Sequence, residues 1–324
     1  MTAVPAFRDL SPRLRAHARA WLPVAVVVLL AGAFGVGSDA FFTLRNATAI
    51  AAQASTLLIA CLGATFVIVM GSIDLSIGAT VLLTGAVSVL ALNAFGLGVG
   101  AVAVGLGLGA ALGLVNGLVF AFGRIPSFVV TLGTMSVFSG VALRLLDGRA
   151  VSYRSPAFEA LAIGQWIPRL PNIALIALAL WAAFVVVANH TRFGRIVFAI
   201  GAGEDVARIA GLPVRRYKVY AFVVSGALAG VAGALAAARL GAAGPTLGGD
   251  LLLNSLGAIV IGGTSLSGGV GGVHRTLLGV LIIAILDDGL NLLGTDPYTQ
   301  LVVKGIVIIL AVLAGRGEAV ETPK

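Results

Sequence analysis

The chain has 324 residues, of which 59% are hydrophobic and 10% are charged, and its mean hydropathy is +1.08. Soluble domains are only about half apolar, so this composition excludes an ordinary soluble protein and indicates a membrane protein. The formal net charge of +8 comes from basic residues that fall mostly in short loops between apolar runs. The positive-inside bias explains that distribution, and no nucleic-acid partner is needed.

A transmembrane helix needs about 20 mainly apolar residues, and the chain offers ten such runs. We therefore predict an all-α polytopic membrane protein with about ten transmembrane helices. One of the runs, within 250–263, is too short to cross the bilayer as a regular helix. In chain order the predicted spans are 21–37, 47–70, 75–94, 96–122, 127–146, 172–189, 219–240, 251–263, 274–293 and 298–314.

Lysine and arginine counts orient these spans. If the basic tail at 1–20 is cytoplasmic, fourteen of the 21 basic residues lie on the cytoplasmic side and both termini face the cytoplasm. The exception is 147–171, which places three arginines outside. Residues 8–34 also resemble a secretory signal with a cleavage site at 38–40, but with or without cleavage the second span enters from outside.

This orientation divides the chain into three parts. They are a cytoplasmic tail at 1–20, a transmembrane domain at 21–314 that includes a polar cytoplasmic segment at 190–218, and a second cytoplasmic tail at 315–324.

Glycines at a spacing of four occur in the fourth and seventh spans. Four of them lie on one face of the fourth span, where another backbone could approach closely. We expect this face to pack within the chain and not to form a dimer contact. The glycines are Gly105, Gly109, Gly113 and Gly117 in the fourth span, and Gly226 and Gly230 in the seventh.

Two stretches that precede short or glycine-flanked helices match each other. Asp74-Leu75 opens the third span and Asp250-Leu251 opens the eighth, and Asn116-Gly-Leu in the fourth span parallels Asp288-Gly-Leu in the ninth. Five spans separate the members of each pair, so they run in opposite directions. We interpret spans 2–5 and 7–10 as two inverted repeats, which are common in transporters.

The chemistry-bearing residue types are sparse. Cys61 is the single cysteine, so a disulfide within the chain is excluded. It lies in an apolar run, where a small core residue is expected. His17, His190 and His274 are scattered along the chain, and neither a metal nor a cofactor is predicted.

The most polar stretch is GAGEDVARIAGLPVRRYK at 201–218. Glu204 and Asp205 would lie in the first turn of a short helix that ends before Pro213. Ala207, Ile209 and Ala210 would be exposed on a cytoplasmic loop, which favours a partner that covers them. The alternative is an ordinary basic loop.

This stretch, together with GSIDLSIGA (71–79), GGTSLSGG (262–269) and DGLNLLG (288–294), resembles the permease subunits of bacterial ATP-binding-cassette importers for simple sugars. The similarity runs from about residue 43 to 312. The resemblance implies a protein of the bacterial inner membrane that contacts lipid. It also implies cytoplasmic ATPase subunits, a periplasmic solute-binding protein, and a second permease copy or a paralogue.

The chain departs from the family at three positions. Family members tend to have Asn where this chain has Asp287 and Asp288, and a small or apolar residue in place of His274. No individual solute is therefore assigned from the resemblance.

In the resemblance, the polar stretch corresponds to the helix that couples the permease to its ATPase. The chain itself has no Walker A motif, because none of its three lysines follows a glycine, so it is predicted not to be an enzyme. The predicted coupling residues are Glu204, Asp205, Ala207, Arg208 and Gly211.

Asp287, Asp288 and Lys304 lie well inside predicted spans, several residues from either end. Because spans 9 and 10 form a hairpin about residue 296, Lys304 should be level with Asp288, and we predict an ion pair of Lys304 with Asp287 or Asp288. A structural pair is favoured over a substrate contact. Asn291 stands where a metal-diphosphate motif would need a third acid, which disfavours that alternative.

A sugar pathway needs amide and hydroxyl groups. Asp74 is expected to cap the third span with help from Ser72 and Ser76, and this structural role is favoured over contact with the solute. The predicted pathway residues are Gln53, Ser55, Asp74, Asn116, Ser127, Thr131, Asn254 and Ser255.

We conclude from the sequence that the chain forms the translocation path of an ATP-driven importer for a small polar solute, a monosaccharide such as a pentose or hexose. The alternative is a proton-coupled secondary carrier that uses Asp74, Asp287, Asp288 and Lys304. An intramembrane enzyme is disfavoured because the chain offers no nucleophile and base set.

Overall fold

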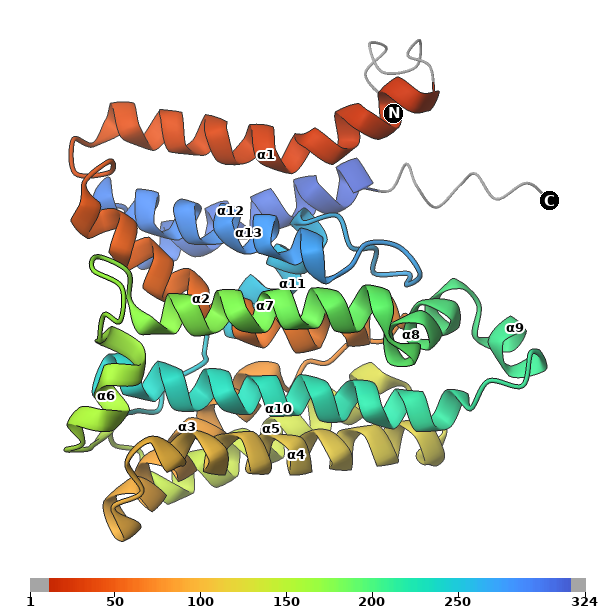
Figure 1. Ribbon diagram of the computed structural model, residues 1–324, viewed down its shortest axis with the longest axis horizontal. Coiled ribbons are helices and arrows are strands. Elements are labelled where there is room, and N and C mark those ends of the chain that lie inside the picture. Colours follow the sequence, from red (N-terminus) through yellow and green to blue (C-terminus); the bar gives the residue numbers. More distant parts are fainter. Residues whose placement is uncertain (1–11, 316–324) are drawn as a thin grey trace.

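The computed structural model describes residues 12–315, and 77% of the chain is helical, so the predicted all-α class is confirmed. The long helices run back and forth side by side (Figure 1). The described helices are α1 (Pro12–Gly37), α2 (Leu44–Val69), α3 (Ile77–Phe95), the 3-10 helix η2 (Gly98–Gly100), α4 (Ala101–Gly123), α5 (Ser127–Leu145), α6 (Pro156–Ile163), α7 (Asn172–His190), α8 (Arg192–Ala202), α9 (Glu204–Ile209), α10 (Val214–Leu240), α11 (Leu251–Ile261), α12 (Val273–Leu292) and α13 (Pro297–Gly315).

Each of the ten predicted spans is occupied by a helix, but the helices differ in length and charge. Six are long and apolar enough to cross a membrane, namely α2, α3, η2 with α4, α5, α7 and α10. α11 has eleven residues and is about 16 Å long, so it cannot cross a core of about 30 Å. α12 contains Arg275, Asp287 and Asp288, more charge than an ordinary spanning helix. The number of helices that cross the bilayer stays a prediction.

The loops contain structure that the sequence analysis missed. In the expected outside loop at 147–171, α6 begins after Ser155, whose hydroxyl accepts the N–H of Phe158. Strand β1 (Val151–Ser152) pairs antiparallel with β2 (Ala242–Ala243) beside it. Thr191 separates α7 from α8. Its hydroxyl accepts the N–H of Gly194 and caps the N-terminus of α8.

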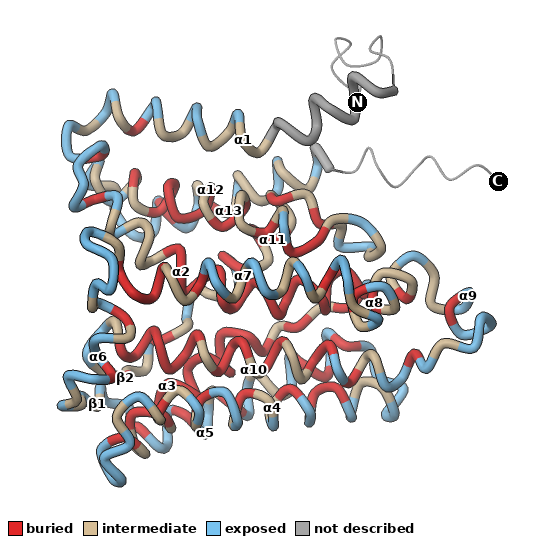
Figure 2. The backbone as a smooth tube through the Cα atoms, viewed as in Figure 1, coloured by how far each residue is buried: buried red, intermediate tan, exposed pale blue. Residues whose placement is uncertain are grey.

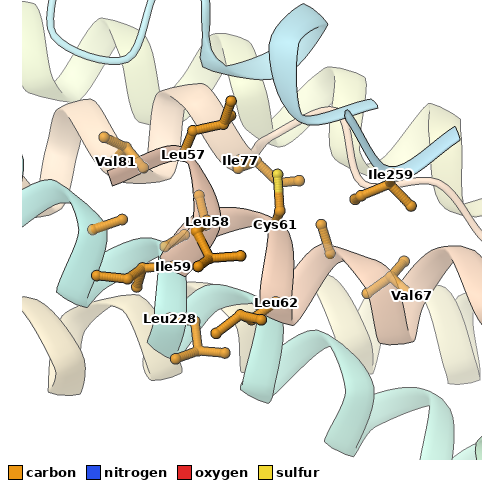
Figure 3. Close-up of a cluster of buried hydrophobic side chains, with 14 of the residues drawn as sticks. Leu57, Leu58, Ile59, Cys61, Leu62, Val67, Ile77, Val81, Leu228 and Ile259 are labelled. Carbon is orange, nitrogen blue, oxygen red and sulfur yellow. The ribbon is translucent and has the colours of Figure 1, made fainter. Parts of the chain in front are cut away.

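The core lies around α2 and α10, which are the most buried long helices (Figure 2). They cross at Gly63 of α2, where an added Cβ would lie 2.6 Å from the Cα of Ser225 on α10. Cys61 is fully buried among apolar side chains on one side of this crossing (Figure 3). The prediction that Cys61 is a small core residue is confirmed.

The glycine face of α4 packs against α10, as expected for a contact within the chain. A Cβ at Gly105 would lie 2.7 Å from the carbonyl oxygen of Gly230, and one at Gly117 would lie 2.8 Å from the Cα of Val219. Gly109 and Gly226 also touch each other through their backbones. Hydrocarbon provides no hydrophobic drive between helices, so this backbone packing holds α4 and α10 together.

We predict that Gly109→Val destabilises the fold, because its side chain would overlap the carbonyl of Gly226. Overpacking costs about 1–3 kcal/mol, and a backbone neighbour cannot move aside, so we expect a loss near the upper end of that range. The control is Gly107→Val on the same helix, at an exposed position with nothing near its added Cβ. Equal melting temperatures of the two purified variants in detergent would contradict the packing argument.

Candidate transport site

Asp74 lies in the turn between α2 and α3, where three hydrogen bonds surround its carboxylate. The backbone N–H and the hydroxyl of Ser76 donate to Oδ1 at 3.0 and 2.6 Å, and the Ser225 hydroxyl donates to Oδ2 at 3.1 Å. Only 5% of Asp74 is exposed. Because Ser225 belongs to α10, these bonds fix the turn to the core of the protein.

The predicted capping role is only partly right. Ser76 binds Asp74 as expected, but Ser76 itself is the N-cap residue of α3. The backbone N–H of Ser72 instead donates to the carbonyl of Val67, closing the end of α2. The partner from α10, Ser225, was missed, because a serine 151 residues away gives no local signal.

Three predicted pathway residues hold the same turn from α4 and α5. The Asn116 amide donates to the Ser76 hydroxyl at 2.8 Å. The Ser127 hydroxyl accepts the backbone N–H of Ile73 at 3.1 Å, and the Thr131 hydroxyl accepts that of Leu75 at 3.0 Å. The structure thus brings Asn116, Ser127 and Thr131 together around the turn at 72–76.

The two broken regions of the chain meet inside the protein. A Cβ added to Gly78, in the first turn of α3, would lie 2.6 Å from the carbonyl oxygen of Gly248 and 3.7 Å from the backbone nitrogen of Leu252 in α11. The N-terminal ends of α3 and α11 therefore lie side by side. Helix N-termini carry partial positive charge and free N–H groups, which suit the oxygens of a polar solute.

A second polar group joins α11, α12 and α13. Lys304 Nζ lies 2.8 Å from Asp287 Oδ1, and both side chains are buried. The Asn254 amide donates to the other oxygen of Asp287 at 3.4 Å. Of the two pairings that the sequence left open, the structure forms the one with Asp287.

Asp288 has a different partner. The Asn46 amide donates to Asp288 Oδ2 at 2.7 Å and to the carbonyl of Phe41 at 3.1 Å. This contact joins α12 to the start of α2. Asn46 was not singled out by the sequence analysis, although it lies near the start of the similarity at about residue 43.

The remaining predicted pathway residues form no group. The Ser55 and Ser255 hydroxyls donate to carbonyls of their own helices, at Ala51 and Leu252, which is common for serine in apolar helices. Gln53 is half-buried on α2. The eight predicted residues therefore divide into four at the Asp74 turn, Asn254 at the ion pair, and these three.

The predicted coupling segment forms α9. Glu204 and Asp205 lie in its first turn, and Gly211 follows its end at a φ of +77°, a conformation that favours glycine. Lys218 Nζ lies 2.8 Å from Glu204 and thereby joins α9 to α10. Arg208 lies 3.5 Å from Glu204 and 3.0 Å from Asp205.

The exposed side of α9 differs from the prediction. Ala207 is 4% exposed, because it packs into the buried hydrophobic core, while the Leu212 N–H donates to the Ala207 carbonyl at 3.1 Å. The expectation that Ala207 is exposed is therefore wrong. Ile209 is 87% exposed and Val206 is 71% exposed. α9 lies at one end of the helix bundle (Figure 1), and these two large side chains form its exposed apolar surface.

Comparison with known proteins places the chain in a family. Residues 46–312 match the model of the branched-chain amino acid transport system / permease component. The chain belongs to this permease family. No solved structure gives a significant match.

Several curated relatives align with most of the permease. It is 37% identical over 308 residues to the ribose import permease protein of Escherichia coli K12, covering 92% of this chain and 95% of that protein. It is 41% identical over 260 residues to the ribose import permease protein of Bacillus subtilis, covering 78% and 79%. It is 34% identical over 298 residues to the D-allose transport system permease protein of E. coli K12, covering 90% and 89%.

The end of α8 connects α9 to the Asp74 turn of the permease. A Cβ added to Gly201 would lie 2.6 Å from the backbone nitrogen of Gly269, and the Gly269 N–H donates to the carbonyl of Val69 at 2.8 Å. Val69 is the last residue of α2, five residues before Asp74. The helix that precedes α9 therefore touches the backbone of both the last residue of α2 and the loop after α11.

We predict that Lys304→Met lowers the free energy of unfolding of the permease by about 3–5 kcal/mol, because Asp287 would keep a buried charge without its partner. The double variant Asp287→Asn with Lys304→Met should recover most of this loss. Thermal unfolding of the purified proteins measures both. A double variant less stable than Lys304→Met alone would contradict the ion-pair assignment.

Proposed function

We propose that this chain is the membrane-embedded permease subunit of an ATP-binding-cassette importer that carries a monosaccharide across the bacterial inner membrane. The observation that carries the proposal is the 37% identity to a ribose import permease over 92% of the chain. The allose relative supports the wider sugar class. ATP hydrolysis belongs to separate subunits, and the permease itself supplies the path.

The remaining partners are a periplasmic solute-binding protein and a second permease, either a copy of this chain or a paralogue. The ATPase would dock on α9, where Val206 and Ile209 are exposed beside the charged side chains of Asp205 and Arg208. Exposed apolar residues of this size on a polar segment are typical of a protein contact. The partly buried Glu204 and the buried Ala207 would support α9 from behind, and Gly211 would fix its exit.

The proposed topology has both termini in the cytoplasm. The start of α1, the end of α13 and α9 lie at the same end of the bundle, and α6 lies at the opposite end (Figure 1). This arrangement supports a cytoplasmic location for all three. The chain termini beyond these helices, at 1–11 and 316–324, lie outside the described residues.

The helix packing supports two inverted repeats. α10 packs against α3 and α4, and α2 packs against α11 and α12. These are the equivalent contacts if α2–α5 correspond to α10–α13. α10 and α2 run in opposite directions through the bundle, as inverted repeats require (Figure 1). Transporters of this kind change access by moving one repeat against the other.

The structure gives no support to the alternative of a proton-coupled carrier. A proton relay needs acids that can exchange protons along a path. Asp287 is bound to Lys304, Asp288 to Asn46, and Asp74 to Ser76 and Ser225. In these contacts all three carboxylates hold helices together.

Transport is tested in proteoliposomes that contain the permease with an ATPase and a binding protein from the same organism. We expect uptake of labelled ribose or allose that requires ATP inside the vesicles and the binding protein outside. Uptake that needs no ATPase and follows a proton gradient would instead establish the secondary carrier.

We predict that Ile209→Glu leaves the amount of folded permease unchanged but lowers co-purification of the ATPase at least tenfold. The residue is 87% exposed, so its replacement does not disturb the core, whereas a carboxylate in an apolar contact costs about 1.4 kcal/mol or more. We call α9 the docking segment. The matched control is Ile167→Glu, which replaces an exposed isoleucine outside this segment. An unchanged yield of ATPase with Ile209→Glu would disprove docking at α9.

A further inference from the structure

A basic hollow of about 890 Å³ lies beside α9. It is bounded by the last turn of α4, the turn between α4 and α5, the helix α9, and the first turns of α10. Its charged lining consists of five cations and one carboxylate, which are Arg124, Arg208, Arg215, Arg216, Lys218 and Glu204.

The internal ion pairs leave much of this positive charge unneutralised. Glu204 is used by Lys218 at 2.8 Å and by Arg208 at 3.5 Å, and Arg208 also reaches Asp205. Within residues 23–313, Arg124, Arg215 and Arg216 have no acidic side chain within salt-bridge distance. Three arginines around one hollow form a strong site for phosphate oxygens, which the guanidinium group binds in a bidentate way.

The hollow continues into an apolar surface. Phe120, Phe122 and Ile125 line it together with the arginines, and Arg215 lies over the ring of Phe122 at 5.8 Å. From there the outer face of α4 exposes Val119, Leu118 and Val115 in succession. A small anion would leave this apolar face uncovered. A molecule with an anionic headgroup and alkyl chains would cover both the basic hollow and the apolar face of α4.

We propose that the hollow binds the headgroup of an anionic phospholipid, with its phosphate among Arg124, Arg215 and Arg216 and its acyl chains along α4. The proposal rests on the proposed membrane orientation, which places the hollow at the cytoplasmic leaflet. Basic pockets between transmembrane helices on that side suit such lipids. Because Glu204 and Arg208 belong both to the hollow and to α9, a bound lipid would contact the docking segment directly.

The test uses the purified full-length permease without its ATPase. Native mass spectrometry measures binding of cardiolipin and phosphatidylglycerol, with phosphatidylcholine as the neutral lipid. We expect the anionic lipids to bind more tightly than the neutral lipid. The double variant Arg215→Gln with Arg216→Gln should weaken the binding of the anionic lipids about 25-fold, or about fivefold per arginine. The matched control removes the same charge with Arg192→Gln and Arg195→Gln, two exposed residues of α8 outside the hollow, and should change binding less than twofold.

Several results would overturn the proposal. Equal losses in the two double variants would show that only the total charge attracts lipid. Displacement of the lipid by inorganic phosphate or glycerol phosphate at similar concentrations would assign the hollow to a small soluble anion. Unchanged lipid binding in the variant that lacks both Arg215 and Arg216 would show that these arginines do not hold a lipid. A failure of sugar transport would not affect these measurements, because they require neither ATP nor solute.

Discussion

The structure depends on direct backbone contact between α10 and its neighbours. Gly105, Gly109, Gly113 and Gly117 bring α4 onto α10, and Gly63 brings α2 onto the same helix at Ser225. Lipid tails are as apolar as leucine, so an apolar side chain gains no free energy from the hydrophobic effect when it moves from lipid to a neighbouring helix. Helices in a membrane therefore associate through close packing. α10 therefore serves as a fixed axis, and the polar groups attached to it are held in fixed positions.

The turn at Asp74 is fixed in position by its attachment to α10. The turn interrupts the helical chain, and an interrupted backbone inside a membrane protein must satisfy its N–H groups with side chains. Ser127, Thr131 and the Asp74 carboxylate accept these N–H groups, while the Ser225 hydroxyl donates to the same carboxylate and attaches it to α10. The turn is thus a rigid polar element that places the start of α3 beside the start of α11.

The sequence predicted the elements better than their contacts. Hydropathy located every long helix, since a run of about 20 apolar residues has few alternatives, and the hairpin about residue 296 brought Lys304 level with the two aspartates. The choice between Asp287 and Asp288 depended on helix rotation, which hairpin counting does not give. Asn46 and Ser225 were missed because their partners are distant in the chain. Ala207 was misplaced because its burial in the hydrophobic core is a tertiary feature.

The same geometry limits how force from an ATPase could reach the transport site. α9 is attached to α10 by Glu204 and Lys218, and α8 is attached by backbone contacts at Gly201 to Gly269 and to Val69. The salt bridge is partly exposed and weak in such a position, whereas the glycine contacts leave no room for a side chain to deform. Movement of the docking segment would therefore pass mainly through Gly201, to the turn that carries Asp74 and to the loop after α11. In the proposed arrangement of two inverted repeats, one displacement at α8 would act on both repeats at once, which is the condition for changing access from one side of the membrane to the other.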